Sequence, residues 1–293
     1  MAGTGEDSAR VTGGADLIRR ISQGPVVVLA RVEKVPGKAY LEVLDALRGP
    51  EDLPSRLRVA FRGANRMRKP GGRPFQVDEG EKAFFVLEPW LDSHGDWPKR
   101  DLFRPAGGYR ARIPLPAEGT PALVEAVRAL VAYEDDPDRS AAEGRLQGWL
   151  TGPNPYLVDV ALDQAARLAL AGPDWIPGLI ARMTDVSPQR RQFAAKAVGL
   201  ALSRGRLTPR KPGRRHLPGD AAWGELVALC RESLVRLARS DPEPEVRRVA
   251  VSHLAMSGLE VWRVLEAIAK EDPDQDVRYE AAAALLEHRR SSR

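Results

Sequence analysis

The chain has 293 residues, enough for about two domains, and its content of 43% hydrophobic and 29% charged residues is that of a globular protein rather than a disordered or fibrous one. Its polar, glycine-rich start lacks the apolar core of a signal peptide, and no apolar run reaches the roughly 18 residues of a membrane span, so the sequence as written predicts a soluble cytoplasmic protein, or an exported one if the true start lies upstream. The net charge of +5 comes from residues 1–117, which hold 20 basic and 15 acidic side chains, because residues 118–293 hold 25 of each.

A short helix and a set of strands are expected in the first 117 residues. Residues 1–13 are interpreted as a flexible N-terminus, and residues 15–22 as a short helix. Apolar or alternating runs between Gly and Pro turns then predict five strands of a small barrel or sandwich: residues 24–35, 41–49, 54–63, 83–90 and 109–115. Pro89 is expected to end the fourth run, and the Asp- and Gly-rich residues 92–101, DSHGDWPKRD, to form a turn.

The order of these strands resembles a bacterial OB-like module whose fold is related to the netrin and metalloprotease-inhibitor (TIMP-like) domains. The pattern V-L-x-x-x-x-G followed by G-E-x-x-x-x-x-L carries the resemblance, which covers residues 24–115. The matching residues are Val43, Leu44, Gly49, Gly80, Glu81 and Leu87. The resemblance implies a five-stranded OB-like β-barrel over residues 14–117. TIMP-like inhibitors chelate zinc through an N-terminal cysteine, which this chain lacks, so that activity is not expected here.

A basic island lies inside the predicted barrel. Residues 55–77 hold seven basic and no acidic side chains, and Leu57 and Val59 alternate there with arginines, as in a strand with one apolar face. OB folds often bind single-stranded nucleic acids through basic and aromatic residues. The candidate contacts are Arg66, Arg68 and Lys69. A solvated loop is the alternative interpretation.

The second half of the chain has a helical pattern with an internal repeat. Residues 118–137 predict a connecting helix, and residues 138–293 a repeat domain. The segments DPEPEVRRVAVSHLA and DPDQDVRYEAAAALL, which start at residues 241 and 272, align at Asp, Pro, Val, Arg, Ala and Leu with an offset of 31. Fainter copies start at Asp185 and at Gly152, which replaces the aspartate, and Val158 replaces the arginine of that first copy. In each full copy Asp caps a helix, Pro fits its first turn, and Val, Ala and Leu form one apolar stripe.

This repeat resembles the HEAT-repeat family, in which paired antiparallel helices stack into an α-solenoid. The resemblance covers residues 138–290 and implies about four helix pairs that bind proteins along an extended surface. In that family the Asp and Arg form a structural ladder between successive repeats. The corresponding ladder residues are Asp185, Arg191, Asp241, Arg247, Asp272 and Arg278.

A second basic island interrupts the repeats. The aligned alanines at 161, 194, 250 and 281 are separated by 33, 56 and 31 residues, so the middle gap contains an insertion at residues 204–218. Residues 204–216 carry six basic and no acidic side chains, and without them residues 118–293 have a net charge of −6. We expect the insertion to be mobile, and to be either a solvated loop or a contact arm. The candidate contacts are Arg206, Arg210, Lys211, Arg214 and Arg215.

Motifs of common catalytic sites do not occur in the sequence. It contains no G-x-S-x-G, no phosphate-cradling glycine loop and no H-E-x-x-H. The single cysteine, Cys230, excludes an intramolecular disulfide and a cysteine metal cluster, and its apolar surroundings predict a core residue. His253, beside Leu254 on a repeat helix, is expected at the surface or in a groove.

These features predict an α+β protein of two domains, a small OB-like β-barrel followed by an α-solenoid of HEAT-like helix pairs. We expect a non-enzymatic scaffold that binds a protein partner along the solenoid, with no catalytic residues, no cofactor and no metal. Nucleic-acid binding through residues 55–77 and 204–216 is the alternative. A HEAT-like enzyme of the glycosylase or lyase type is a third reading, with Asp159, Asp163 or Glu280 as its acid. The partner and the oligomeric state are left open.

Overall fold

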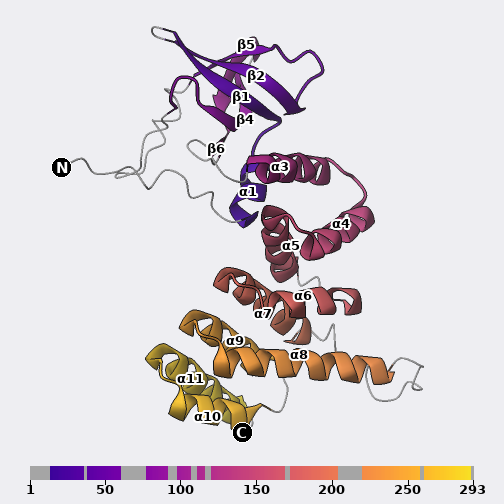
Figure 1. Cartoon of the computed structure of the whole chain (residues 1–293), viewed down its shortest axis with the longest axis vertical. Coiled ribbons are helices and arrows are strands. Elements are labelled where there is room, and N and C mark those ends of the chain that lie inside the picture. The colour runs from indigo at the N-terminus through magenta and orange to yellow at the C-terminus, as the bar shows by residue number, and fades with distance from the viewer. Residues whose placement is uncertain are drawn as a thin grey trace, which may run out of the picture. The chain divides into compact units, whose positions relative to one another are not determined.

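Figure 1 shows the computed structural model of the chain. The structure describes residues 14–35, 38–60, 77–91, 98–106, 111–115, 120–168, 172–203, 220–257 and 261–291. The chain divides into two compact units, residues 1–145 with 154–160 and residues 146–153 with 161–293. The fold is α+β, with a closed five-stranded barrel in the first unit and helices in the second. Within the described residues, no helix has both the length and the apolarity that a bilayer crossing needs.

The strands of the first unit close into a barrel. Their bounds are β1 (Val26–Val35), β2 (Lys38–Arg48), β3 (Arg56–Val59), β4 (Lys82–Leu91), β5 (Pro98–Pro105) and β6 (Arg112–Pro114). The order is β1-β2-β3-β5-β4, and β1 also pairs with β4, which closes the ring. The β3–β5 pair is parallel and the other pairs are antiparallel. β6 adds to β4 outside the ring of five.

The barrel core follows from the apolar pattern of the strands. On β3, Leu57 is fully buried whereas Arg56 and Arg58 are exposed, as the alternation predicts. Phe84 and Phe85 of β4 are both fully buried, although neighbouring residues of a strand point to opposite faces. β4 is therefore covered on both faces, which explains its continuous apolar run.

Close packing at the start of β1 depends on a glycine. A Cβ on Gly24 would lie 2.8 Å from the backbone oxygen of Leu87 and 2.8 Å from the Cβ of Ala106. Only glycine fits where two segments approach so closely. The preceding helix α1 (Gly14–Ile21) adds three buried side chains to this core: Leu17, Ile18 and Ile21.

The fifth barrel strand differs from the prediction. We expected residues 109–115 to provide it and residues 92–101 to form a turn, but residues 98–105 form β5 and pair with both β3 and β4. The β5 sequence PKRDLFRP has only two adjacent apolar residues between charged ones, so it lacks the alternation that marks a strand. Pairing with two neighbours overrides this weak local preference.

Pro89 does not end β4, contrary to the prediction. The strand continues to Leu91, and its register against β5 shifts between Pro89 and Leu91. Proline has no backbone N–H to donate, and strands tolerate it at such irregularities. A strand end and a bulge therefore give the same signal in the sequence.

The helix predicted as a connection, α3 (Thr120–Glu134), packs against α1 and β2 in the first unit. Its stripe of buried residues is Leu123, Ala126, Val127, Leu130 and Val131. Arg48 of β2 forms an ion pair with Asp135 at 2.8 Å, and Arg128 of α3 forms one with Asp45 of β2 at 2.6 Å. These contacts join the helix to the barrel that precedes it.

The helices of the second unit pack in consecutive pairs. Each of the helices α4 (Arg139–Thr151) and α5 (Pro155–Leu168) is divided between the two units. The later helices are α6 (Ile176–Arg182), α7 (Pro188–Ser203), α8 (Asp220–Ser240), α9 (Pro244–Met256), α10 (Trp262–Glu271) and α11 (Gln275–Ser291). α6 packs with α7, α8 with α9 and α10 with α11, and the second helices of the pairs lie side by side, α7 on α9 and α9 on α11 (Figure 1).

Small side chains allow these second helices to approach closely. Ala194 of α7, Ala250 of α9 and Ala281 of α11 are fully buried at equivalent positions of the repeat. Gly199 of α7 faces His253 of α9, and a Cβ on this glycine would lie 2.3 Å from the Cβ of the histidine. The helix contact therefore has no room for a larger residue at position 199.

Candidate functional site

Two buried arginines join successive helix pairs in the second unit. Nε and Nη2 of Arg191, on α7, donate to the two carboxylate oxygens of Asp241 at 2.7 and 2.8 Å. Arg247, on α9, makes the same two contacts with Asp272, both at 2.9 Å. Paired contacts of this kind fix both distance and direction. They connect each second helix to the aspartate that precedes the next second helix.

The remaining nitrogen of each arginine contacts its own repeat. Nη1 donates to the carbonyl oxygen of the aspartate six residues earlier in all three copies. The pairs are Arg191 with Asp185 at 2.8 Å, Arg247 with Asp241 at 2.8 Å and Arg278 with Asp272 at 2.6 Å. The three arginines therefore occupy equivalent positions, and each of the first two connects its own repeat to the next one.

The carboxylate of Asp185 has other partners, since the preceding copy of the repeat has Val158 in place of the arginine. This carboxylate lies 3.3 Å from Arg182 and 3.6 Å from Arg190. Arg182 also donates to the carbonyl oxygen of Gly152 at 3.2 Å. Arg182 of α6 thus supplies Asp185 with the positive partner that an arginine at position 158 would supply in a complete repeat.

Each ladder aspartate also accepts a hydrogen bond from the backbone N–H two residues later. The donors are Ser187 to Asp185 at 2.9 Å, Glu243 to Asp241 at 3.0 Å and Asp274 to Asp272 at 2.9 Å. Burial alone would raise the pKa of Asp272, but the hydrogen bonds from Arg247 and from this backbone N–H hold it below its ordinary value. The pKa of Asp185 is lowered in the same way against the effect of burial. Both carboxylates are therefore ionised at neutral pH.

The second helices also share a row of equivalent positions that the packing leaves at least partly exposed. α9 packs on α7, α8 and α11, and the positions seven, eleven and fifteen residues after each ladder aspartate lie along one further face. None of the nine residues at these positions is buried. We call this set the open face: Gln192, Lys196 and Leu200 on α7; Arg248, Ser252 and Met256 on α9; Tyr279, Ala283 and Glu287 on α11.

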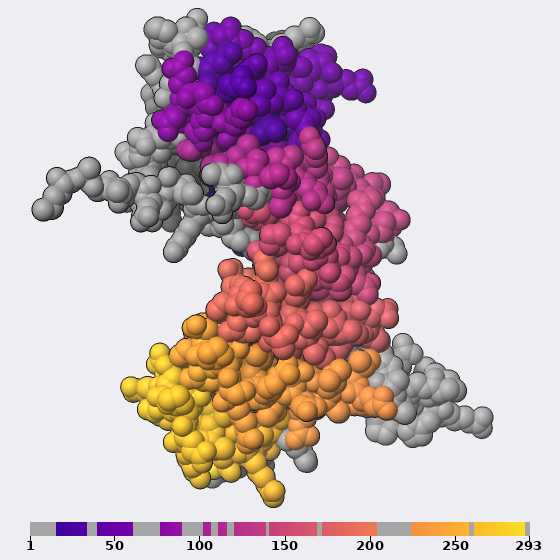
Figure 2. All heavy atoms as spheres, viewed as in Figure 1, coloured from indigo at the N-terminus to yellow at the C-terminus, as the bar shows by residue number. Residues whose placement is uncertain are grey.

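The open face combines apolar side chains with charged ones of both signs. Met256 is 49% exposed and Tyr279 is 75% exposed, so both side chains are accessible to a partner. Lys196 is exposed as well, and Arg248 is paired with Glu245 at 2.6 Å in a solvent-exposed contact. In Figure 2 the yellow spheres of the C-terminal helices lie beside the orange spheres of the helices before them, in agreement with the packing of α11 on α9.

His253 is buried, which corrects the prediction that it lies at the surface or in a groove. It is 8% exposed, and its Nδ1 has no hydrogen-bond partner among the described residues. Burial, and then the positive charge of Lys196, lower the pKa of His253 to about 4. The imidazole is therefore neutral at physiological pH and acts as a packing residue between α7 and α9.

The outer surface of β1, β2 and β3 is charged. Arg56 pairs with Glu33 at 2.7 Å, and its guanidinium lies 4.2 Å from the centre of the Tyr40 ring. Arg31 pairs with Glu42 at 2.9 Å. Positive and negative side chains therefore alternate over these three strands.

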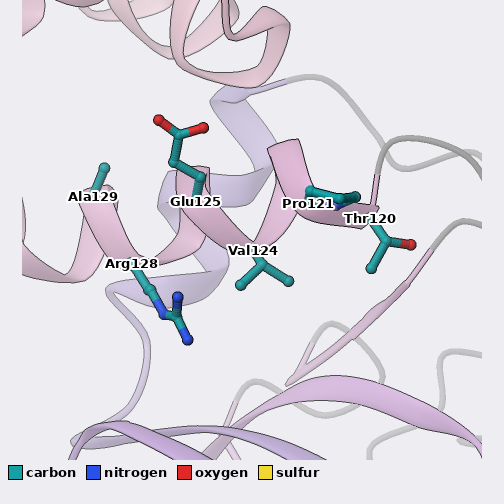
Figure 3. Close-up of a pocket in the computed structure, with 6 residues that line it drawn as sticks. All are labelled: Thr120, Pro121, Val124, Glu125, Arg128 and Ala129. Carbon is teal, nitrogen blue, oxygen red and sulfur yellow. The ribbon is translucent and has the colours of Figure 1, made fainter.

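A shallow hollow of about 610 Å³ lies along α3 in the first unit. Figure 3 shows Val124 and Arg128 pointing to one side of the helix and Glu125 to the other. Its charged side chains are engaged, because Arg128 pairs with Asp45 and Glu125 accepts a hydrogen bond from Asn154 at 3.2 Å. The hollow therefore presents mainly apolar surface.

The residues predicted as contacts lie outside the described part of the chain. This holds for Arg66, Arg68 and Lys69 of the first island and for Arg206, Arg210, Lys211, Arg214 and Arg215 of the second. The predicted flexible N-terminus, residues 1–13, also lies outside it. Of the first island, the structure describes residues 55–60 and 77.

The described residues contain no group of three or more His, Cys, Asp or Glu side chains placed to hold a metal ion. Cys230 is fully buried on α8, as its apolar surroundings predict, and burial raises the pKa of its thiol to about 12. Asp159 and Asp163 lie on α5, where Asp163 is 3.8 Å from Arg167, whereas Glu280 lies on α11.

No protein-family model matches the chain, and no curated protein or solved structure is significantly similar to it. The function of this protein must therefore follow from its residues and their geometry.

Proposed function

We propose that this protein is a non-enzymatic protein-binding module whose second unit is a HEAT-like solenoid. The open face is the surface that holds the protein partner. The barrel is an OB-like domain that precedes the solenoid in the chain. No cofactor or metal takes part in this function.

The observation that carries the proposal is the pair of identical ladder contacts. Arg191 with Asp241 and Arg247 with Asp272 have the same two-point geometry and join helices that pack side by side. Repeats joined in this way bring equivalent positions of α7, α9 and α11 onto one continuous surface. Binding residues on packed helices are held more precisely than residues on loops.

The composition of the open face supports a protein as the partner. Tyr, Met and Arg are enriched in protein interfaces, and exposed apolar residues rimmed by polar ones are typical of such surfaces. Met256 and Tyr279 supply the apolar part, and Lys196, Arg248 and Glu287 surround it with charges of both signs. A partner segment with apolar residues flanked by charged ones of both signs complements this arrangement.

A photoreactive amino acid placed at Ser252 tests the proposal, because Ser252 lies in the middle of the open face. The control is the same amino acid at Glu232, an exposed position on α8. Cross-linking in cells should attach a defined protein at position 252 and not at position 232. The double variant Met256→Glu, Tyr279→Ser should then weaken binding of that isolated protein about tenfold or more. Equal capture at both positions, or unchanged affinity of the double variant, would contradict the proposal.

Nucleic-acid binding is a second candidate, favoured by the barrel. The strand order β1-β2-β3-β5-β4 with a return to β1 resembles that of an OB fold, in which the face of the second and third strands binds oligonucleotides. Arg56, Arg58 and Tyr40 lie on β2 and β3 and supply positive charge and an aromatic ring. The carboxylates of Glu33 and Glu42 offset this charge, so the protein-binding proposal ranks first.

Titration of fluorescent single- and double-stranded DNA and RNA at low and high salt tests the second candidate. Binding through the barrel predicts that Arg58→Glu weakens affinity and lowers the salt slope by about one or more. Deletion of residues 206–217 tests the second island, and an unchanged salt slope excludes it as a contact. Absence of binding at micromolar concentration in low salt eliminates this candidate.

A further inference from the structure

The last helix of the second unit exposes a face that its equivalent buries. Counted from the ladder aspartate, Ala282 and Leu285 of α11 correspond to Val251 and Leu254 of α9, which are both fully buried. Ala282 and Leu285 are only half-buried, and Leu286, the next residue, is 56% exposed. The difference follows from packing, because α9 lies between α7 and α11, whereas in the described residues no further helix packs beyond α11 (Figure 1).

Arg278 repeats one half of the ladder contacts. Its Nη1 donates to the carbonyl oxygens of Asp272 and Pro273 at 2.6 and 3.1 Å. In Arg191 and Arg247 the opposite edge, formed by Nε and Nη2, holds the next aspartate. In Arg278 that edge meets no carboxylate in the part of the chain that the structure describes. The side chain of Arg278 is half-buried, whereas Arg191 and Arg247 are 8% and 6% exposed.

This arrangement is a preformed site for a carboxylate. The two carbonyl contacts hold the guanidinium of Arg278, and arginine binds carboxylates best through two parallel N–H donors. Ala282, Leu285 and Leu286 follow four, seven and eight residues later and therefore lie on the same side of α11. A charged contact surrounded by apolar residues is strengthened when binding removes water.

We propose that this end face, defined as Arg278, Ala282, Leu285 and Leu286, binds an amphipathic helix of a partner protein that begins with an aspartate. The carboxylate accepts from Nε and Nη2 of Arg278, and the apolar side of the helix covers the three apolar residues. The internal contacts are the template, because Asp241 precedes the helix that covers α7 and Asp272 the helix that covers α9. The end face and the open face use different residues, so either can fail experimentally without the other.

A second copy of the chain does not fit as the occupant, because its repeat aspartates are already paired. Asp241 and Asp272 are bound by Arg191 and Arg247, and Asp185 lies near Arg182 and Arg190. The last turn of α11 is also basic, with His288, Arg289 and Arg290. An acidic segment of a different protein is the complement of this charge.

The test measures binding of a fluorescent synthetic peptide to the full chain by anisotropy. The peptide has the sequence of residues 268–291, the segment whose aspartate and helix cover the equivalent face of α9. We expect saturable binding that weakens about tenfold when the peptide aspartate equivalent to Asp272 becomes asparagine. Arg278→Lys in the full chain should weaken it to a similar degree, since lysine keeps the charge but lacks the paired donors. Combining the two changes should cause no further loss.

Arg239→Lys is the matched control, because it makes the same substitution at an exposed arginine of α8, outside the end face. Its binding should stay within about twofold of the unmodified chain. The asparagine peptide leaves the protein untouched, so a folding defect of a variant cannot hide the answer. The proposal is wrong if the peptide does not bind saturably, or if both peptides bind alike. Self-association that disappears in Arg278→Lys would also overturn it, since the occupant would then be a second copy.

Discussion

His253 shows how one side chain can couple the packing of the second unit to pH. It lies against Gly199, where α7 and α9 pack closely, and its Nδ1 lacks a partner in the described residues. The folded protein therefore disfavours the protonated imidazole, and burial together with Lys196 sets its pKa at about 4 instead of 6.5.

Acidification should destabilise the protein through this residue. The unfolded chain takes up a proton on His253 near pH 6.5, whereas the folded chain accepts this proton only near pH 4. The free energy of unfolding therefore keeps its full value above pH 6.5 and decreases as the pH falls toward 4. At pH 5 the loss amounts to about 2 kcal/mol relative to pH 7.5. Urea unfolding of the wild type and of His253→Leu at both pH values measures it. An equal decrease in the two proteins would exclude His253 as the cause.

At the scale of elements, the ladder arginines decide how firmly one helix pair holds the next. Arg247 lies between α9 and the start of α11, with its guanidinium bound to Asp272 on one edge and to its own repeat on the other. The hydrogen bonds that Arg247 donates to Asp272 raise the pKa of Arg247 above its ordinary value, against the effect of burial. The pair is therefore charged at neutral pH.

Two neighbouring arginines provide a matched test of this contact. Arg247→Ala should lower the free energy of unfolding by about 3–5 kcal/mol, because it leaves the buried carboxylate of Asp272 without its partner. Arg248→Ala removes a solvent-exposed pair with Glu245 and should change it by less than about 0.5 kcal/mol. Denaturant unfolding compares the two variants. Similar losses in both would mean that the ladder contact contributes no more than a surface ion pair.

The sequence predicts the Asp–Arg contacts between successive repeats only in part. The repeat pattern predicts which aspartates and arginines matter, but Arg191 and Arg247 each lie between two of these aspartates in the sequence, and spacing alone does not say which carboxylate each binds. The structure assigns the carboxylate of the next repeat and the carbonyl oxygen of its own, as for Arg191 with Asp241 and Asp185. The prediction that His253 lies at the surface or in a groove was wrong for a similar reason. The space that buries it comes from Gly199, 54 positions earlier in the sequence.

The barrel shows the same limit at the level of strands. β1 and β4 have long apolar runs that predict them directly, whereas β5 is defined by its two neighbours and not by its own residues. Charge alone suggests the candidate contacts of both basic islands, and because these residues lie outside the described part of the chain they stay predictions. The open face and the end face depend on which helices pack together, which the sequence indicates only through the period of the repeat.

For the whole molecule, the consecutive packing of helix pairs predicts that a destabilising substitution affects mainly the neighbouring helices. Each pair of the second unit packs mainly on its sequence neighbours, so stability there depends on neighbouring contacts. Arg247→Ala should therefore speed amide exchange in α10 and α11 more than in α6 and α7, and leave β1 to β5 unchanged. Hydrogen-exchange mass spectrometry of the intact chain resolves these segments. Uniform acceleration across both units would contradict local coupling.

The ring of five strands also has a consequence for how fast the protein forms. Closing it requires β1 to meet β4, with Val28 opposite Phe85, and β3 to meet β5, with Val59 opposite Phe103. Such distant partners must find each other before their contacts compensate for the lost chain entropy, whereas each turn of helix joins residues only four apart. The barrel should therefore be the slower of the two units to fold, although ribosomes synthesise it first. In newly synthesised chains we therefore expect the helices of the second unit to pack before β1 pairs with β4 and β3 pairs with β5.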